Sequence, residues 1–123
     1  MSRETLEQRR AQHAWQAIQE FKSEKKAKEL AGHAKKLPMR IKAAGLGQAL
    51  AFLNAKMERD NLLHEALTNW VVTQRQIGQP EKQGLIATLI KGDSNTLRRA
   101  TDEVMAWLEW FNRFAEAEGL KSE

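Results

Sequence analysis

The chain has 123 residues, of which 41% are hydrophobic, and this is enough for one domain with a sizeable core. It contains no cysteine, which excludes disulfide bonds and thiolate metal sites and fits a reducing compartment, so we expect a cytoplasmic protein. No segment approaches the ~20 apolar residues of a membrane span, and no apolar signal-peptide core follows the N-terminus, so we expect neither export nor a membrane partner.

Apolar residues recur at helical spacing from the start of the chain, whereas strand signals are nearly absent. A first stripe is formed by Ala11, Ala14, Trp15, Ile18 and Phe21. A second stripe is formed by Ala27, Leu30, Ala31 and Ala34. At about 100° per residue the two stripes point roughly 160° apart, so one straight helix cannot turn both toward one core. We expect a break or bend between Lys22 and Lys26, or else an unbroken helix that faces two different neighbours.

The dipeptide Leu37-Pro38 predicts a second junction. A residue before proline is disfavoured in the helical conformation, and Pro38 suits the first turn of a new helix. Gly45 and Gly47 predict a further turn or a close packing contact. The helix that follows carries the apolar stripe Leu46, Ala49, Leu50, Leu53 and Met57.

The second half of the chain predicts three more helices. Between residues 60 and 77 the apolar face consists of Leu62, Leu63, Ala66, Leu67, Trp70, Val71 and Ile77, before Gly78 and Pro80. A short apolar helix contains Leu85, Ile86, Leu89 and Ile90 and is closed by Gly92. Asp93 or Ser94 then caps a long last helix with the stripe Leu97, Ala100, Val104, Leu108, Phe111 and Ala115. We predict an all-α fold: a compact single domain, 1–123, of about six helices, with a long C-terminal helix and a frayed tail at 118–123.

Positive charge is concentrated between residues 22 and 42. This stretch carries Lys22, Lys25, Lys26, Lys28, Lys35, Lys36, Arg40 and Lys42. These eight cations oppose only Glu24 and Glu29, so the segment has a net charge of +6, whereas the whole chain is only +4. Such an excess indicates a docking surface for an anionic partner, and lysine ammonium groups suit phosphates without base specificity. No aromatic is interleaved with the lysines, so base stacking within the segment is not expected. The alternative is a solvated helix face that binds nothing.

Arg98, Arg99 and Trp110 are further candidates for contact with a ligand or partner. The two arginines open the last helix, where cations oppose the positive end of the helix dipole, and this cost indicates an anionic ligand or simply exposure to solvent. Trp110 lies off the centre of its stripe and is a candidate partner contact. The other three tryptophans, expected in the core, are Trp15, Trp70 and Trp107.

Sequence signals for catalysis are weak. His64-Glu65 begins like a zinc-protease motif, but Thr68 occupies the position of the second histidine. The segment Gly45-Leu46-Gly47 lacks a third glycine and follows no strand, so it is not a dinucleotide-binding loop. The histidines are few and widely separated: His13, His33 and His64. We therefore expect no metal, no cofactor and no enzymatic activity.

Two blocks of the sequence resemble a known protein family. The first is Leu37-Pro38-Met39-Arg40-Ile41 followed by Gly45-Leu46-Gly47-Gln48-Ala49-Leu50-Ala51-Phe52-Leu53. The second is Leu97-Arg98-Arg99-Ala100-Thr101, Glu103, and Ala106-Trp107-Leu108-Glu109-Trp110-Phe111-Asn112-Arg113-Phe114-Ala115. Together with Gln8-Arg9 and Ala14, they resemble the small subunit of the type III-B CRISPR effector, the Cmr complex, over residues 7 to 117. That family often has an aromatic where Leu97 stands.

The resemblance implies an all-helical, non-catalytic subunit that is present in several copies in an RNA-guided assembly used in antiviral defence. Its implied partners are guide RNA, target RNA, other Cmr subunits and further copies of itself, with the protein holding RNA backbones while base pairing reads the sequence. Pro38, Gly45 and Phe52 are expected to serve as a turn, a close contact and a core residue. Two alternatives remain open, a helical DNA-binding regulator and a protein-only scaffold whose lysines meet acidic partners.

Overall fold

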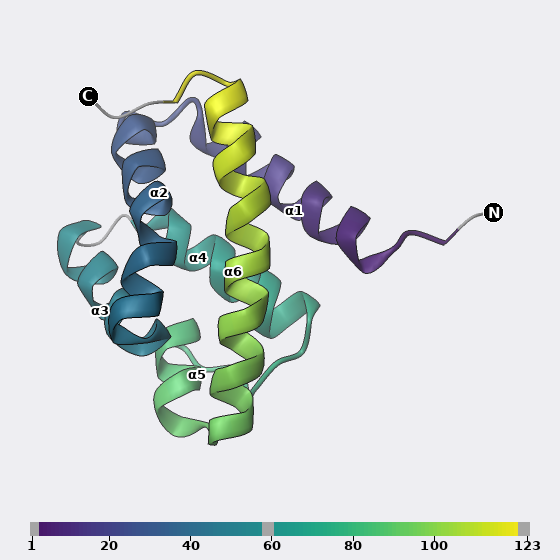
Figure 1. Cartoon of the computed structure of the whole chain (residues 1–123), viewed down its shortest axis with the longest axis vertical. Coiled ribbons are helices and arrows are strands. Elements are labelled where there is room, and N and C mark those ends of the chain that lie inside the picture. Colours follow the sequence, from purple (N-terminus) through teal and green to yellow (C-terminus); the bar gives the residue numbers. More distant parts are fainter. Residues whose placement is uncertain (1–2, 58–60, 121–123) are drawn as a thin grey trace.

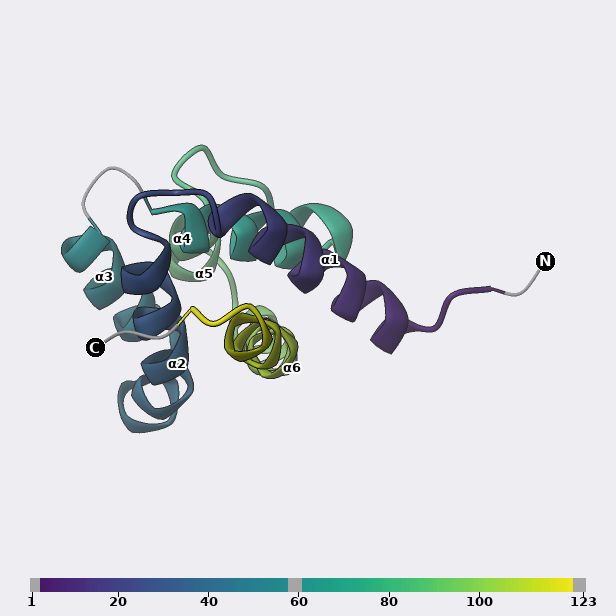
Figure 2. The same cartoon turned by 90° about the horizontal axis from the view of Figure 1, so that it is seen from above.

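A computed structural model describes residues 3–57 and 61–120, which contain six α-helices, one π-helical segment and no strand. The elements are α1 (Leu6–Phe21), α2 (Ala27–Ala44), α3 (Leu46–Met57), α4 (Leu62–Thr68), η1 (Asn69–Gln74), α5 (Leu85–Lys91) and α6 (Ser94–Ala117). The long α6 runs through the middle of the molecule, with α1 on one side and α2 on the other (Figure 1). Viewed along α6, α3 lies outside α2 (Figure 2). The predicted all-α bundle with a long C-terminal helix is confirmed.

Most helix ends follow local sequence signals. Thr5 caps α1 in a capping box, because its hydroxyl accepts the N–H of Gln8 while the Gln8 side chain accepts the N–H of Thr5. The predicted break between Lys22 and Lys26 is confirmed, since α1 ends at Phe21 and α2 begins at Ala27. Gly45 ends α2 with a φ of 89°, a conformation that favours glycine. Of the two residues predicted to cap the last helix, Asp93 does so by accepting the N–H of Thr96.

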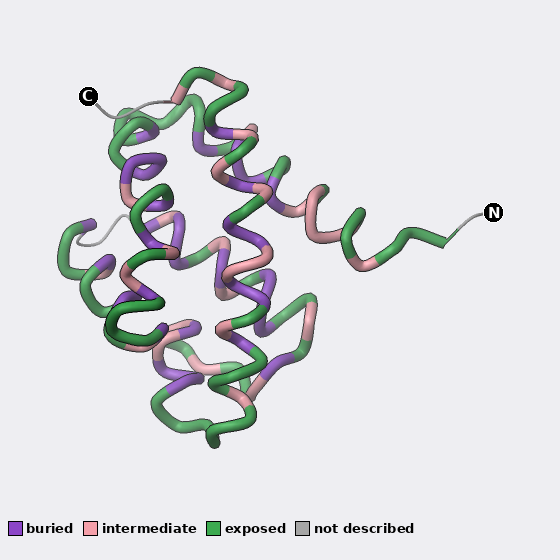
Figure 3. The backbone as a smooth tube through the Cα atoms, in the orientation of Figure 1, coloured by how far each residue is buried: buried purple, intermediate pink, exposed green. Residues whose placement is uncertain are grey.

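Buried residues line the facing sides of the helices (Figure 3). Trp107 stacks on Phe111 with 4.8 Å between ring centroids, and Phe21 meets Phe111 edge-on at 5.6 Å. The prediction that Trp70 and Trp107 are buried is confirmed. The same prediction for Trp15 is wrong, since this side chain is 43% exposed. It lies at the edge of the buried stripe of α1, where it packs edge-on against Phe114 at 5.2 Å.

The residues that follow α6, at the start of the segment predicted to fray, form backbone hydrogen bonds to its last turn. The N–H of Gly119 donates to the carbonyl of Glu116, and the N–H of Leu120 donates to the carbonyl of Ala115. Leu120 also packs against the core. Residues 118–120 thus contact α6 and the core, whereas residues 121–123, like Asp60, lie outside the described residues, and fraying of the tail stays a prediction. No helix within the described ranges is long and apolar enough to cross a membrane.

The predicted junction at Pro38 is wrong, because α2 continues through this proline to Ala44. In a continuous helix, the N–H of residue 38 would bond the carbonyl of Ala34, but proline has no N–H. A side chain from α6 replaces the missing donor: Asn112 Nδ2 donates to the carbonyl oxygen of Ala34 at 3.0 Å. The carbonyl that Pro38 leaves free is thus satisfied from a neighbouring helix, which removes one cost of an internal proline.

A buried carboxylate joins α1, α6 and the segment after η1. Glu103 of α6 is 4% exposed, and it accepts a hydrogen bond from Arg10 Nε at 2.8 Å. Arg75 donates to the other oxygen of the same carboxylate. Two guanidinium groups therefore compensate the charge of Glu103, as a buried ion requires.

Removal of the Asn112 amide is expected to destabilise the protein through Ala34. Asn112→Ala should lower the free energy of unfolding by about 1–3 kcal/mol, because it leaves a buried carbonyl without a partner. In a Pro38→Ala background the restored N–H can serve that carbonyl, so the same change should cost less. Urea unfolding of the wild type, both single variants and the double variant measures the coupling. An equal cost in both backgrounds would contradict this role of Asn112.

Removal of the Glu103 carboxylate is expected to lower the free energy of unfolding by about 3 kcal/mol, because two arginines then lose their buried partner. Glu109→Ala is the matched control, since Glu109 is an exposed glutamate on the same helix and its loss should cost less than about 0.5 kcal/mol. Chemical unfolding of Glu103→Ala and Glu109→Ala tests the difference. Similar midpoints for the two variants would mean that the triad does not join these elements.

Candidate nucleic-acid interface

A row of lysines follows one side of α2. Lys28, Lys35 and Lys42 are all exposed and stand seven residues apart. Each therefore lies only about 20° around the helix from the one before it and about 10.5 Å further along the axis. Because α2 continues through Pro38, all three belong to one helix, and we call them the lysine row. The exposed Met39 lies beside this row.

The other predicted cations of this segment lie in three places. Lys36 and Arg40, one turn apart on α2, lie on the side toward α3, where the Arg40 guanidinium covers the Phe52 ring at 4.3 Å from its centroid. Lys22 lies 3.8 Å from the carboxylate of Glu118. Lys25 and Lys26, in the connection before α2, line a hollow of about 410 Å³ together with Glu24, Leu30 and Leu62.

Of the two arginines at the start of α6, Arg99 lies apart from the lysine row. Arg98 donates to the side-chain oxygen of Asn95 at 2.9 Å. Arg99 lines a hollow of about 200 Å³ that also includes Arg10 and Arg75, which places it on the α1 side of α6. Since α2 lies on the other side of α6 (Figure 2), the structure does not bring Arg99 together with the lysine row.

Trp110 makes contacts within the chain. Its ring stacks on Phe114 with 5.7 Å between centroids, and its Nε1–H donates to the carboxylate of Glu7 at 3.0 Å. Trp15 meets the same Phe114, so three aromatic side chains join α1 to α6. Trp110 is half-buried, and its role as a partner contact stays a prediction.

Phe52 and Lys56 of α3 belong to the same surface, although neither was among the predicted site residues. The prediction that Phe52 is a core residue is wrong, since the side chain is 42% exposed. Lys56 Nζ lies 5.4 Å from the Phe52 ring centroid. One signal was present in the sequence, because Phe52 falls outside the apolar stripe of its helix. Its proximity to Arg40 appears only when α2 and α3 pack together.

His33 lies among these cations. Burial lowers the pKa of His33, and the positive charges of Arg40, Lys36 and Lys56 add to this effect, while Glu29 acts in the opposite direction. In the part of the chain that the structure describes, the nitrogens His33 Nδ1 and Arg40 Nη1 are buried and have no hydrogen-bond partner. We call His33, Lys36, Arg40, Phe52 and Lys56 the Phe52 cluster.

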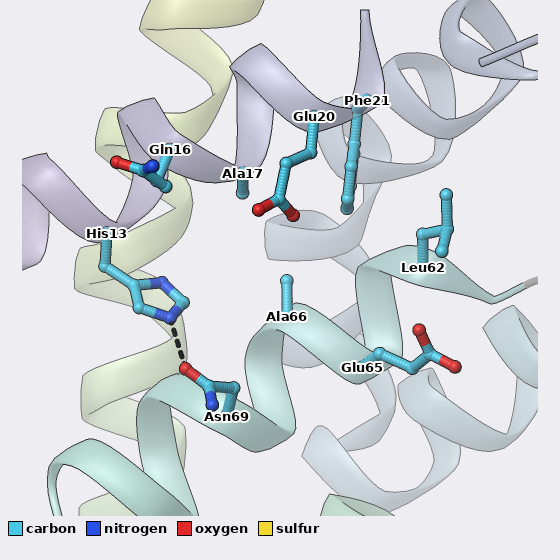
Figure 4. A pocket seen from close by; sticks show the side chains of 9 residues that line it. All are labelled: His13, Gln16, Ala17, Glu20, Phe21, Leu62, Glu65, Ala66 and Asn69. Carbon is cyan, nitrogen blue, oxygen red and sulfur yellow. Dashed lines mark hydrogen bonds between the residues drawn. The ribbon is translucent and has the colours of Figure 1, made fainter. Parts of the chain in front are cut away.

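A third concave region, of about 370 Å³, lies between α1 and the α4–η1 segment (Figure 4). Its lining residues are His13, Gln16, Ala17, Glu20, Phe21, Leu62, Glu65, Ala66 and Asn69. His13 Nδ1 accepts the Nε1–H of Trp107 at 2.9 Å, so Nε2 carries the proton and donates to Asn69 Oδ1 at 2.8 Å. Burial lowers the pKa of His13, and both ring nitrogens are engaged within the chain, which leaves neither free for proton transfer.

The residues of the zinc-protease-like segment connect α4 to α5. His64 is buried, and its Nε2 accepts the N–H of Ile86 at 3.3 Å. Thr68 donates to the carbonyl of His64 at 2.8 Å and accepts the N–H of Leu85 at 2.9 Å. Gly84 approaches so closely that a Cβ there would lie 2.7 Å from His64 Cε1. Within residues 3–57 and 61–120, no group of three or more His, Cys, Asp or Glu side chains is placed to hold a metal ion.

The fold and its charges define the class of protein: a small all-helical protein with a basic helix on its surface. The family model described as CRISPR-associated protein (Cas_Cmr5) matches residues 6–118. A curated relative, the CRISPR system Cmr subunit Cmr5 of Thermus thermophilus, is 34% identical over 107 residues, which cover 87% of this chain and 90% of the relative.

A solved structure agrees with these sequence matches. The crystal structure of a CRISPR-associated Cmr5 family protein from Thermus thermophilus is similar with a TM-score of 0.72 and 31% identity. The similarity covers 94% of this chain and 97% of that one. The chain belongs to the Cmr5 family of CRISPR-associated proteins, and the resemblance to the small Cmr subunit is confirmed.

Protonation of His64 is expected to destabilise the fold. Burial lowers its pKa below the ordinary value of 6.5, so its contribution to stability is complete above pH 6.5 and is lost as the pH falls through the lowered pKa. Thermal unfolding should therefore occur at a lower temperature at acidic pH than at neutral pH. His64→Gln should show a smaller decrease, because glutamine can accept the Ile86 N–H without taking up a proton. The same pH dependence in both proteins would contradict the role of His64.

Proposed function

We propose that this protein is a non-catalytic, RNA-binding subunit of a type III-B Cmr complex, acting in cytoplasmic antiviral defence. In this proposal the lysine row contacts phosphates of the guide or target RNA. The observation that carries the proposal is the alignment of Lys28, Lys35 and Lys42 on one continuous helix. The name of the Thermus thermophilus relative, a Cmr subunit, supports the assignment to the complex.

The chemistry of the row favours contact with an RNA backbone. Ammonium groups act as point charges on flexible stems, so they attract phosphates without reading base identity. Neutralisation of phosphates releases counterions, and this release supplies affinity that falls as salt rises. Such binding suits an assembly in which base pairing reads the sequence and the protein holds the strands.

Packing against other subunits is the second part of the proposal. Met39 and Ile90 are each 76% exposed, and Trp15 and Leu97 are also partly open to solvent. Exposed apolar side chains on a small protein are suited to burial against a partner. We propose that they contact other Cmr subunits or further copies of this chain.

Charge reversal of the lysine row tests the proposed RNA contact. Contact with about three phosphates predicts a slope near −2 when log affinity for single-stranded RNA is plotted against log salt. The variant Lys28→Glu/Lys35→Glu/Lys42→Glu should bind far more weakly and with a slope closer to zero. Fluorescence anisotropy with a labelled single-stranded RNA measures both quantities between about 50 and about 200 mM salt.

Lys82→Glu provides the control, because Lys82 is an exposed lysine in the loop before α5 and does not belong to α2. This variant should bind RNA like the wild type. An affinity that does not depend on salt, or one unchanged by the triple reversal, would overturn the proposed contact. If the reversal instead abolished recovery of partner subunits and left RNA binding intact, the row would serve a protein interface.

A further inference from the structure

Between α2 and α3, the Phe52 cluster combines an exposed aromatic ring with several cations. Phe52 as a residue is 42% exposed, although the Arg40 guanidinium lies 4.3 Å and Lys56 Nζ 5.4 Å from its ring centroid. Phenylalanine is most often buried in folded proteins, so a ring left open among cations is not explained by the core alone. Phe52 does not belong to the packed stripe of α3, whose buried residues are Leu46, Ala49, Leu50, Leu53 and Met57.

We propose that the Phe52 cluster binds one unstacked nucleotide of single-stranded RNA, with the base against Phe52 and Arg40 and its phosphate near Lys36 and Lys56. This inference rests on the proposed function, because it requires that the chain bind RNA. It adds a contact with a base to a surface whose lysine row contacts only the backbone. It also selects single strands over duplexes, since bases inside a duplex are already stacked on one another.

The geometry of the ring and the guanidinium suits a base. Unpaired bases stack on aromatic rings and on the planes of arginine side chains, and here the two surfaces lie together. Arg40 is half-buried, and its guanidinium places a permanent positive charge beside the ring, which attracts the phosphate of the same nucleotide. A lysine at position 40 would keep the charge but would lose the planar surface.

The Phe52 cluster lies next to the lysine row on the surface of the protein. Lys36 and Arg40 lie on the same helix as the row, separated from it by the exposed strip that includes Met39. An RNA backbone held along α2 therefore passes within reach of the α2–α3 edge, where a base can turn toward Phe52. The concentration of cations at this edge favours a nucleotide over an apolar protein segment.

Phe52→Ala tests the inference. We expect a roughly five- to hundredfold loss of affinity for single-stranded RNA, the range found when one stacked base loses its aromatic platform. The salt slope should stay that of the wild type, because no cation is removed. Affinity for duplex RNA of the same length should stay unchanged. Phe52→Trp should retain the affinity, since indole provides a larger stacking surface.

Controls separate stacking from damage to the fold. Trp15→Ala removes an aromatic side chain that is equally exposed but lies on α1, so it should leave RNA affinity unchanged. Arg40→Lys provides a second variant in case Phe52→Ala does not fold, and it should also weaken single-strand binding. Circular dichroism and thermal unfolding verify that each variant is folded.

Cross-linking gives a direct readout. Irradiation of the wild type with single-stranded RNA that contains 4-thiouridine, followed by trypsin and mass spectrometry, should place a cross-link in the peptide that spans residues 43–56. Unchanged single-strand affinity in Phe52→Ala, with a large loss in the lysine-row variant, would overturn the inference and leave the proposed function intact. Equal losses for single-stranded and duplex RNA would also overturn it. No salt-dependent RNA binding by the wild type would refute both.

Discussion

The hydrogen bond from Asn112 to the carbonyl of Ala34 allows a proline to lie in the middle of α2. Without a donor for this carbonyl, Pro38 would leave a buried acceptor unpaired, and the helix would be expected to bend or end. With the bond present, α2 extends from Ala27 to Ala44 and keeps Lys28, Lys35 and Lys42 on one side. The same continuity brings Arg40 against Phe52 of α3. A contact inside the bundle therefore determines the arrangement of charge on its surface.

Some charged and polar groups of the protein are buried and bonded within the fold, whereas others are exposed and can bind a partner. Glu103 is buried and bonded by Arg10 and Arg75, and Trp107 and Asn69 occupy both nitrogens of His13. These groups stabilise the contacts of α1 and η1 with α6. The lysine row, by contrast, stands in solvent on the other side of α6 (Figure 1). Lys28, Lys35 and Lys42 form no ion pair within the described residues, so their ammonium groups are available to an anionic partner.

The sequence alone predicted those structural features that depend on residues close together in the chain. The change in direction of the apolar stripe predicted a break or bend between Lys22 and Lys26, and Asp93 was one of two residues predicted to cap the last helix. Pro38 was misread because its compensating donor lies 78 residues away from Ala34 in sequence. Phe52 was misread for a similar reason, since only the packing of α2 on α3 brings a guanidinium to its ring. Helical periodicity places the lysines around α2, but it could not separate Arg99 from them, because that separation depends on which side of α6 each helix packs.

The central claim is that the α2 surface holds RNA in the assembled complex. The most direct test is to purify the protein from its own cells at low salt, irradiate the native complex, and map RNA cross-links on this chain by mass spectrometry. The account predicts that Cmr subunits and guide RNA co-purify, with cross-links concentrated between residues 28 and 56. Cross-links confined to the α1 side of α6, or recovery of the chain without RNA, would contradict it.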